Sequence, residues 1–250
     1  MMQGESEFKI SVITVTYNSE HTIRRTIESV LNQTYQDVEY LLIDGKSDDN
    51  TVEIAREYED KFRKKGYTYC IFSESDNGMY DALNKGIALA TGSIIGQINS
   101  DDWYEPMALQ RVADTYQKKN FDVFWADLRV IKESGNMIKK AKQSLFASTR
   151  YWNHPTTFIR AEVYKKNPYA LLSMYDDFEL ILRLRKKGYR MVVLNEVLAN
   201  FSFGGMSTQK KWEDMLKRIR WRCQNYKQNG YGPIYYMDSV CVEVVKFLLA

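Results

Sequence analysis

The sequence predicts an α/β fold with a mixed, mainly parallel central sheet that is flanked by helices, and a smaller antiparallel element in the second half. Within the first hundred residues four apolar, β-branched segments alternate with three amphipathic segments, the order that right-handed βαβ units produce. Each of the four predicted strands is followed by acidic or amide residues. Ligands of open α/β sheets bind beside the carboxyl ends of strands, so these polar residues mark a candidate crevice.

The first half of the chain is assigned from the spacing of its apolar residues and from its helix ends. Ile23, Ile27 and Val30 recur at helical spacing, and Gly66 suits the end of a helix. The predicted order is strand Lys9–Tyr17, helix Glu20–Asn32, strand Val38–Ile43, helix Thr51–Lys64, strand Tyr67–Ser73, helix Met79–Ala90 and a strand that begins at Ser93.

The second half contains a hairpin signal. The turn residues Glu133-Ser-Gly-Asn136 separate two segments that we expect to pair as strands. The predicted order is helix Pro106–Lys119, strands Phe121–Lys132 and Met137–Lys142, a short strand within His154–Arg160, helix Asp177–Lys187 and strand Tyr189–Leu194.

Length and charge narrow the class of protein. The 250 residues suffice for one large domain, and we expect a single domain over 1–250. The net charge of +3 is too small to indicate a nucleic-acid partner. Cys70, Cys223 and Cys241 are widely spaced and odd in number, which fits free thiols in a reducing compartment. Because the N-terminus shows no signal-peptide pattern, we expect a cytoplasmic protein.

The segment Ser93–Tyr104 carries the sharpest local signal. Its apolar run ends in Asn99-Ser-Asp-Asp102, and two adjacent carboxylates are costly to bury without a counter-charge. A divalent cation supplies that charge, and such cations prefer oxygen ligands. We therefore expect Asp102 to hold a metal that in turn holds a diphosphate. Capping of a helix that starts near Pro106 is the alternative interpretation.

Eight short motifs run in order from about Lys9 to Ser207. They are Ser11–Asn18, Glu39–Ser47, Asp76–Gly86, Ala90–Gly92, Asn99–Asp102, His154–Phe158, Asp177–Leu180 and Gly204–Ser207. Together they resemble the family 2 glycosyltransferases, which are nucleotide-sugar-dependent enzymes of the GT-A fold. The resemblance implies an inverting sugar transfer from a nucleotide sugar, often linked to UDP, with Mg²⁺ or Mn²⁺ as cofactor. Many similar enzymes build bacterial cell-surface polysaccharide, so the implied acceptor is a glycan or a lipid-linked glycan.

The resemblance also divides the chain into a donor half at about 9–104, an acceptor half at about 105–207 and a helical tail at 208–250. The implied nucleotide-sugar-binding residues are Thr16, Tyr17, Asn18, Asp44, Asp76 and Asp101. Many family members carry a second carboxylate where this chain has Gly45, and that carboxylate often contacts the nucleobase of the donor. The identity of the nucleobase therefore stays open. Loop capping by Asn18 and core packing by Tyr17 are the structural alternatives.

Asp177 is the candidate general base. An inverting transfer needs a carboxylate to take the proton of the acceptor hydroxyl as that hydroxyl attacks opposite the leaving group. Asp176 competes for this role, and capping of the helix that follows is the structural alternative for both. His154 is a candidate second contact to the metal, and a hydrogen-bonded structural histidine is the alternative interpretation.

The tail suggests a surface function. Lys210–Lys227 mixes tryptophans with many basic residues, which is typical of a helix that lies on an anionic membrane; packing on the core is the alternative. Val240–Leu249 is apolar and suits a homodimer interface, a lid or a membrane contact. Peripheral attachment to the inner face of the membrane would suit a lipid-linked acceptor.

Two other classes of protein fit part of the pattern. A nucleotide-sugar-binding module without transfer activity would keep the donor half and lose the base, and the presence of Asp177 argues against it. A flavodoxin-like signalling domain fits the alternation of strands and helices, but it does not explain the antiparallel second half.

Overall fold

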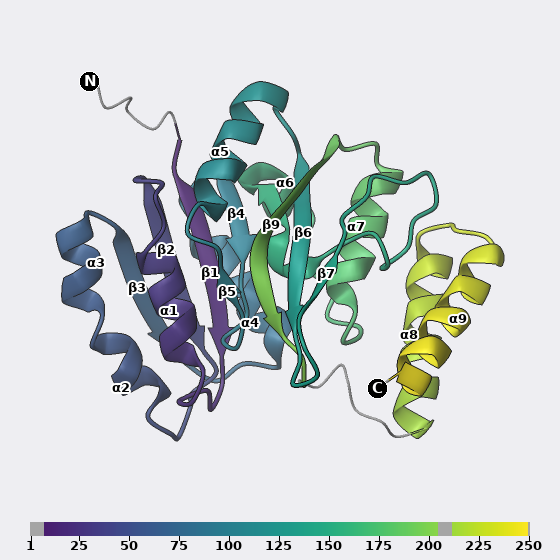
Figure 1. Ribbon diagram of the computed structural model, residues 1–250, viewed down its shortest axis with the longest axis horizontal. Helices are drawn as coiled ribbons and strands as arrows, with labels where there is room; N and C mark the ends of the chain where they lie inside the picture. Colours follow the sequence, from purple (N-terminus) through teal and green to yellow (C-terminus); the bar gives the residue numbers. More distant parts are fainter. Residues whose placement is uncertain (1–7, 205–211, 250) are drawn as a thin grey trace.

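The computed structural model describes residues 8–204 and 212–249 of the chain (Figure 1). Its strands are β1 (Ile10–Thr16), β2 (Val38–Asp44), β3 (Thr68–Ser73), β4 (Ile94–Gln97), β5 (Trp103–Tyr104), β6 (Val123–Ile131), β7 (Met137–Lys139), β8 (Phe158–Arg160) and β9 (Met191–Ser202). Its helices are α1 (Ile23–Leu31), α2 (Thr51–Arg56), α3 (Glu59–Lys65), α4 (Met79–Leu89), α5 (Ala108–Lys119), the 3₁₀ turn η1 (His154–Thr156), α6 (Ala161–Lys166), α7 (Asp176–Lys186), α8 (Trp212–Gln228) and α9 (Ile234–Leu249).

Across the described residues the strands form one mixed sheet in the order β3-β2-β1-β4-β8-β6-β9-β5, and β7 pairs with β6. β1 to β4 are parallel to one another, as βαβ units require. β8 is antiparallel to both β4 and β6, whereas β6 and β9 are parallel. The predicted fold class is therefore confirmed, and the antiparallel element lies in the second half as expected.

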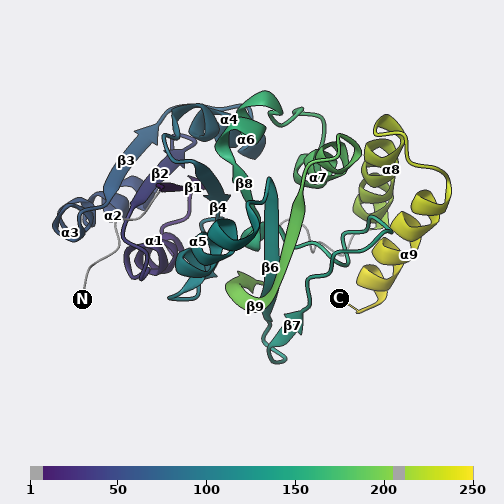
Figure 2. The ribbon, with the colours of Figure 1, turned by 90° about the horizontal axis from the view of Figure 1, so that it is seen from above.

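Helices cover both faces of the sheet because its inner strands are apolar on both sides. In β1, Ile10 and Val12 pack into the core that faces α1, α3 and α5. Ile13 and Val15, which point to the opposite face, pack into the core that faces α4, α6 and α7. Figure 2 shows these two helical layers on either side of the strands.

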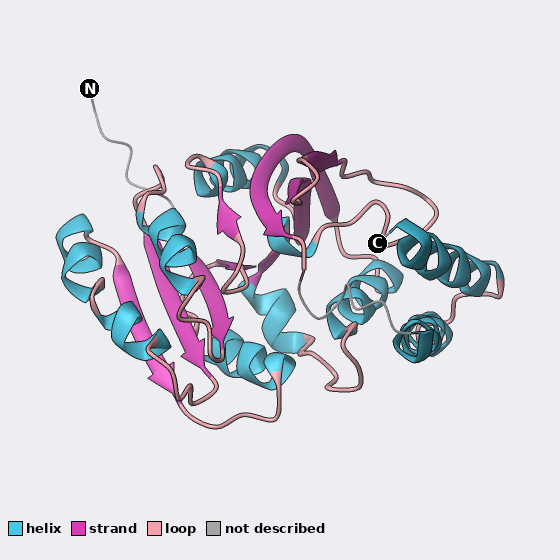
Figure 3. Ribbon diagram, turned by 60° about the horizontal axis from the view of Figure 1, so that its bottom comes forward, coloured by secondary structure: helices cyan, strands magenta, loops and turns pink. Residues whose placement is uncertain are grey.

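The last two helices lie at one edge of the molecule. α8 packs on α7, and α9 packs on α8 (Figure 3). The Glu243 carboxylate of α9 is completely buried and accepts hydrogen bonds from Arg218 Nε at 2.8 Å and Arg222 Nη1 at 3.3 Å. One face of the tail thus packs on the core. No helix among the described residues has the length and apolarity needed to cross a bilayer.

The prediction of a single helix over Thr51–Lys64 is wrong, because this segment forms two helices, α2 and α3, with Tyr58 between them. The break places the Tyr58 ring in the core, where it is 1% exposed. The Tyr58 hydroxyl donates to Glu28 Oε1 at 2.6 Å and accepts from Arg24 Nη1 at 3.1 Å. At Tyr58 these contacts with α1 take the place of a continuous helix from α2 to α3.

Two strand predictions in the second half also need correction, and two elements were not predicted. The strand expected within His154–Arg160 begins only at Phe158, because η1 precedes it. The strand expected at Tyr189–Leu194 continues to Ser202 as β9. The sequence did not indicate β5 or α6. β5 exists because Trp103 and Tyr104 pair with Asn200 and Ala199 of β9, a contact between distant parts of the chain.

Candidate functional site

The loops after β1, β2 and β4 are joined by hydrogen bonds at the carboxyl edge of the sheet. Asn18 N–H donates to Ser47 Oγ at 2.9 Å, and Asp48 N–H donates to Asn18 Oδ1 at 3.1 Å. Asn18 also adopts a left-handed backbone conformation with φ of 48°. Ser19 Oγ lies 2.9 Å from Ser100 Oγ. Three of the polar strand exits therefore form one connected surface.

Tyr17, Gly45 and Asp76 meet at this surface. A Cβ atom built on Gly45 would lie 2.7 Å from Asp76 Oδ2 and 3.5 Å from the Tyr17 ring, so both side chains approach the glycine closely. The Tyr17 ring is 62% exposed. Asp76 Oδ1 accepts from Gly78 N–H at 2.7 Å. The arrangement offers an open aromatic face beside a carboxylate.

Asp44 and Thr16 are buried next to this surface. The Asp44 carboxylate accepts hydrogen bonds from Ser47 N–H at 3.0 Å, Ser47 Oγ at 2.5 Å and Ser73 Oγ at 2.6 Å. These bonds hold the loops after β2 and β3 in place. Thr16 Oγ1 is buried and has no hydrogen-bond partner among the described residues. The open surface is thus formed by Tyr17, Asn18 and Asp76, with Asp44 below it.

Asp102 is a buried carboxylate with one unused oxygen. Asp102 Oδ1 accepts from Ser202 N–H at 2.9 Å. Asp102 Oδ2 is buried and has no hydrogen-bond partner among the described residues. Burial, and secondarily the negative charge of Asp101, raise the pKa of Asp102 well above its ordinary value. A buried carboxylate oxygen without a hydrogen-bond donor among the described residues fits a hard cation.

Arg25 of α1 supplies a positive charge beside the two carboxylates. Its guanidinium lies 3.7 Å from the centre of the Trp103 ring, within cation–π range. Arg25 Nη2 donates to the Asp101 carbonyl at 2.8 Å and to Ser202 Oγ at 2.9 Å. Arg25 therefore binds the backbone of the loop and leaves the two carboxylates without a direct hydrogen bond to it.

Asp177 pairs with His154 at the start of α7. Asp177 Oδ2 lies 2.9 Å from His154 Nδ1, and the two side chains are 16% and 14% exposed. Asp177 Oδ1 accepts from Phe178 N–H at 2.7 Å. Together with Gln97, the last residue of β4, both side chains line a small cavity. Burial and the Asp177 carboxylate raise the pKa of the nearby Tyr80 hydroxyl well above its ordinary value.

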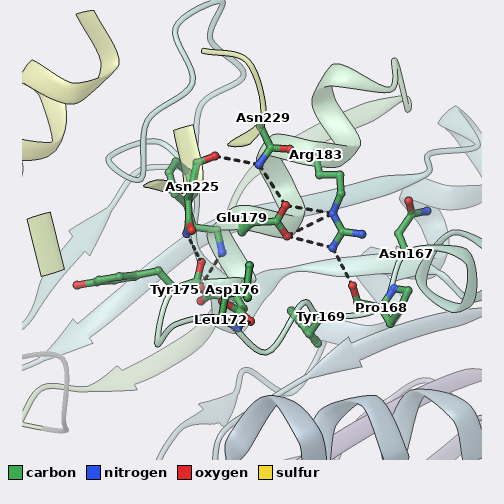
Figure 4. A network of polar contacts seen from close by, with 12 residues as sticks. Asn167, Pro168, Tyr169, Leu172, Tyr175, Asp176, Glu179, Arg183, Asn225 and Asn229 are labelled. Atoms are coloured by element: carbon green, nitrogen blue, oxygen red, sulfur yellow. Dashed lines mark hydrogen bonds and ion pairs between the residues drawn. The ribbon is translucent and has the colours of Figure 1, made fainter. Parts of the chain in front are cut away.

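Asp176, the neighbouring carboxylate, is fully used by the loop before α7. It is completely buried and accepts from Leu172 N–H at 2.7 Å and from Ser173 N–H at 2.8 Å. Figure 4 shows Asp176 beside the ion pair of Glu179 and Arg183, whose Oε2 and Nη2 atoms are 3.0 Å apart. This group of contacts fixes the start of α7 and leaves Asp177 as the carboxylate that faces the cavity.

No three His, Cys, Asp or Glu side chains converge as a metal site within the described part of the chain. A cation at Asp102 would therefore take most of its ligands from a bound diphosphate or from water, with Asp101 as the nearest other carboxylate. His154, which the sequence also suggested for the metal, has its Nδ1 atom against Asp177. In the Gly204–Ser207 motif, only Gly204 lies within the described residues, with φ of 137°; Gly205, Met206 and Ser207 lie outside them.

The family follows from a match along most of this region. Residues 11–175, which include Tyr17, Asp76, Asp102 and His154 but end before Asp177, match the family model described as "Glycosyl transferase family 2". The chain belongs to glycosyl transferase family 2. It is 26% identical to the O-antigen biosynthesis glycosyltransferase WbnJ of Escherichia coli over 211 residues, which are 80% of this chain and 82% of WbnJ.

Two solved structures share the fold of this family 2 chain. S. aureus TarS in complex with UDP-GlcNAc superposes with a TM-score of 0.66 at 20% identity, over 95% of this chain and 72% of the TarS chain. The mannosyltransferase PcManGT from Pyrobaculum calidifontis in complex with GDP-Man and Mn²⁺ superposes with a TM-score of 0.65 at 16% identity, over 96% and 70% of the two chains. The chain therefore has the GT-A fold.

Sequence reasoning missed Arg25 and Ser202 as neighbours of the Asp101–Asp102 pair in this family 2 chain. Arg25 is an ordinary exposed helix residue in the sequence pattern. Ser202 follows Asp102 by a hundred residues, and only the pairing of β5 with β9 brings the two together. Neither residue carries a local sequence signal, so only the fold could identify them.

Proposed function

We propose that this glycosyltransferase moves one sugar, with inversion, from a nucleotide sugar to a hydroxyl of a glycan or lipid-linked glycan. A UDP-sugar is the favoured donor because the TarS complex contains UDP-GlcNAc. The role of WbnJ in O-antigen biosynthesis supports a product in cell-surface polysaccharide. The observation that carries the proposal is that the buried Asp102 carboxylate keeps one oxygen without a hydrogen-bond donor among the described residues, while Asp177 lines a small cavity beside the end of β4.

The donor nucleoside would bind at the open surface of Tyr17, Asn18 and Asp76. The exposed Tyr17 ring offers a face on which a base can stack. The Asp76 carboxylate accepts hydrogen bonds from base N–H or ribose O–H groups. Asp44 supports this surface from below through its bonds to Ser47 and Ser73. Asp101 contributes its carboxylate to the ribose or to the metal.

Asp102 is the residue that would hold Mg²⁺ or Mn²⁺, and Mn²⁺ is the first ion to test because the PcManGT complex contains it. Such a cation neutralises the charge that develops on the departing diphosphate. The bond from Ser202 N–H holds the Asp102 carboxylate in a fixed orientation. Its buried, unpartnered Oδ2 is the oxygen that would bind the cation.

Asp177 would act as the general base. As the acceptor oxygen bonds to the anomeric carbon, the bond from that carbon to the diphosphate breaks and its electron pair leaves with the diphosphate. The proton of the acceptor hydroxyl passes to the Asp177 carboxylate. His154 holds Asp177 Oδ2 through the 2.9 Å contact to Nδ1, and we assign it this positioning role in place of a metal contact. Asp176 is completely buried, is bonded to the loop before α7 and does not line the cavity, so we do not assign it the proton.

Calorimetry and turnover of matched variants test these assignments. UDP should bind more tightly in the presence of Mn²⁺, and Asp102→Asn should remove that difference. Asp177→Asn should keep the UDP affinity of the wild-type protein and lower kcat by about 10²- to 10⁴-fold. Asp60→Asn, on the exposed surface of α3, is the matched control and should change neither quantity.

Three results would reject the proposal. An equal affinity for UDP with and without Mn²⁺ would exclude Asp102 as a metal ligand. Full turnover by Asp177→Asn would exclude that residue as the base. A wild-type protein that binds donors in a thermal-shift screen, yet transfers no sugar to any glycan acceptor, would point to a nucleotide-sugar-binding module instead.

A further inference from the structure

Helix α9 exposes an apolar stripe along its length. Ile234 is 63% exposed, Met237 69%, Val245 52% and Leu248 75%, and Cys241 between them is also exposed. Their spacing of three or four residues places them on one face of the helix. Large exposed apolar side chains in a continuous row usually mark a surface that contacts a partner or a membrane.

The stripe faces away from the protein, and the opposite face of α9 is already packed. Ser239, Val242 and Glu243 are buried against the rest of the molecule. Glu243 is held by Arg218 and Arg222 of α8. Figures 1 and 2 show α8 and α9 as the outermost elements beyond α7. The stripe therefore lies on the face of α9 opposite to the face that packs on the rest of the protein.

Charge on the two helices favours an anionic partner. The exposed surface of α8 and α9 carries the cations Lys217, Arg220, Lys227 and Lys246, against the exposed carboxylate of Glu213 at the start of α8. Two of these cations have a partner, because Lys217 Nζ lies 3.9 Å from Oδ1 of the half-buried Asp214 and Lys246 Nζ lies 3.3 Å from Glu243 Oε1. The two carboxylates of α9 do not reach this surface, because Glu243 is buried and Asp238 pairs with Arg150 at 2.9 Å. Apolar residues bordered by cations complement a membrane that contains anionic lipids.

Trp212 adds the side chain that most often lies at a membrane–water interface. Its ring is 59% exposed and contacts Phe247 of α9 edge-on, with ring centres 5.9 Å apart. The start of α8 and the end of α9 thus join into one amphipathic edge. Tryptophan suits the headgroup level because its ring is apolar and its indole N–H is polar.

We propose that α9, with the exposed side of α8, lies flat on an anionic lipid surface and attaches the enzyme to it reversibly. The helix is too short and too charged to span a bilayer, so its apolar stripe enters the interface only. The apolar stripe shares no residue with the proposed donor, metal and base sites, so this proposal stands independently of the proposed chemistry.

Vesicle flotation tests the proposal with the full chain. The wild-type protein should float with vesicles of phosphatidylcholine and phosphatidylglycerol and stay unbound with phosphatidylcholine alone, and added salt should release it. Met237→Glu combined with Leu248→Glu should lower the bound fraction about tenfold or more, since two apolar side chains lose their burial. Met107→Glu, at an exposed methionine before α5, is the matched control and should float like the wild type.

Equal melting temperatures of all three proteins would show that the substitutions leave the fold intact. Failure of the wild type to float with anionic vesicles would overturn the proposal, and so would unchanged flotation of the double variant. A dimer in light scattering that the double variant converts to a monomer, in a protein that does not float, would assign the stripe to a contact between two copies of this chain instead.

Discussion

Replacing Asp102 by Asn should stabilise the protein while it removes the proposed metal site. The carboxylate is completely buried, and its Oδ2 atom has no donor among the described residues. Asn has nearly the same shape, and its carbonyl oxygen can keep the bond from Ser202 N–H. The substitution thus removes a buried negative charge without creating a cavity. The reason for the carboxylate would then be function and not folding.

The expected gain follows from the charge alone, since the Asn amide takes the same unpartnered place: burying an unsatisfied neutral polar group costs about 1–3 kcal/mol, and burying a charged one costs more. Arg25 lowers this cost because its positive charge lies close to Asp102. We therefore expect a gain of about 1–2 kcal/mol at neutral pH. For a chain of this length each kcal/mol raises Tm by about 2–4 °C.

The gain should depend on pH in a defined direction. Burial raises the pKa of Asp102 in the folded state above the value of about 3.9 of an unfolded chain. Below that unfolded value both states are protonated, so the ionisation costs nothing. As pH rises, the unfolded state loses its proton first, and the folded wild type becomes progressively less stable. The difference between Asp102→Asn and wild type should therefore be small in acid and largest near neutrality.

Thermal and urea unfolding at several pH values, with and without Mn²⁺, measure this effect. Mn²⁺ at a hundredfold excess over its Kd should add about 2.7 kcal/mol to the wild type and nothing to Asp102→Asn. Asp127→Asn is the matched control, because the buried Asp127 carboxylate accepts from Ala141 N–H at 2.7 Å and Lys140 Nζ at 2.7 Å; it should lose stability. Two results would refute the reasoning. One is a loss of stability in Asp102→Asn as large as that of the control, and the other is a stability difference between Asp102→Asn and wild type that does not change with pH.

Three further substitutions test single contacts. Glu243→Gln leaves the buried Arg222 guanidinium without its carboxylate and should cost about 3–5 kcal/mol in urea unfolding; a neutral result would contradict a structural ion pair. Gly96→Ala places a Cβ 2.2 Å from Phe158 Cε1 and should cost about 1–3 kcal/mol, so an unchanged Tm would show that β4 and β8 can separate. Tyr17→Ala should weaken UDP binding about tenfold by calorimetry, and equal affinity would exclude stacking.

The first half of the fold could be predicted because its signals are local. The inner strands are apolar on both faces, and Gly66, with φ of 81°, ends its helix as expected. Prediction failed where a distant partner decides the local structure. Tyr58 breaks a helix to reach α1, and the two residues of β5 form a strand only because β9 pairs with them.

The candidate site could also be predicted only where its residues carry a local signal. The sequence placed Asp102 and Tyr17 at strand ends, and the parallel topology brings their loops together. It could not show that the Asp76 carboxylate lies against Gly45, since those residues come from the loops after different strands. A side chain at position 45 would displace Asp76, so the bare glycine and the carboxylate of the next loop have to be understood as one unit.

Hydrogen bonding distinguishes carboxylates that the sequence presents as equivalent. Asp44, Asp127 and Asp176 are all buried, and in each of them both oxygens accept hydrogen bonds from backbone or side-chain donors. Asp102 lacks a donor at Oδ2 among the described residues. A buried, incompletely bonded carboxylate weakens a fold, so selection for stability alone would fill or remove it. Asp177 differs in another way, because its oxygens meet Phe178 N–H and His154 Nδ1 while the side chain faces a cavity. A cation can therefore be assigned to Asp102, and a proton to Asp177.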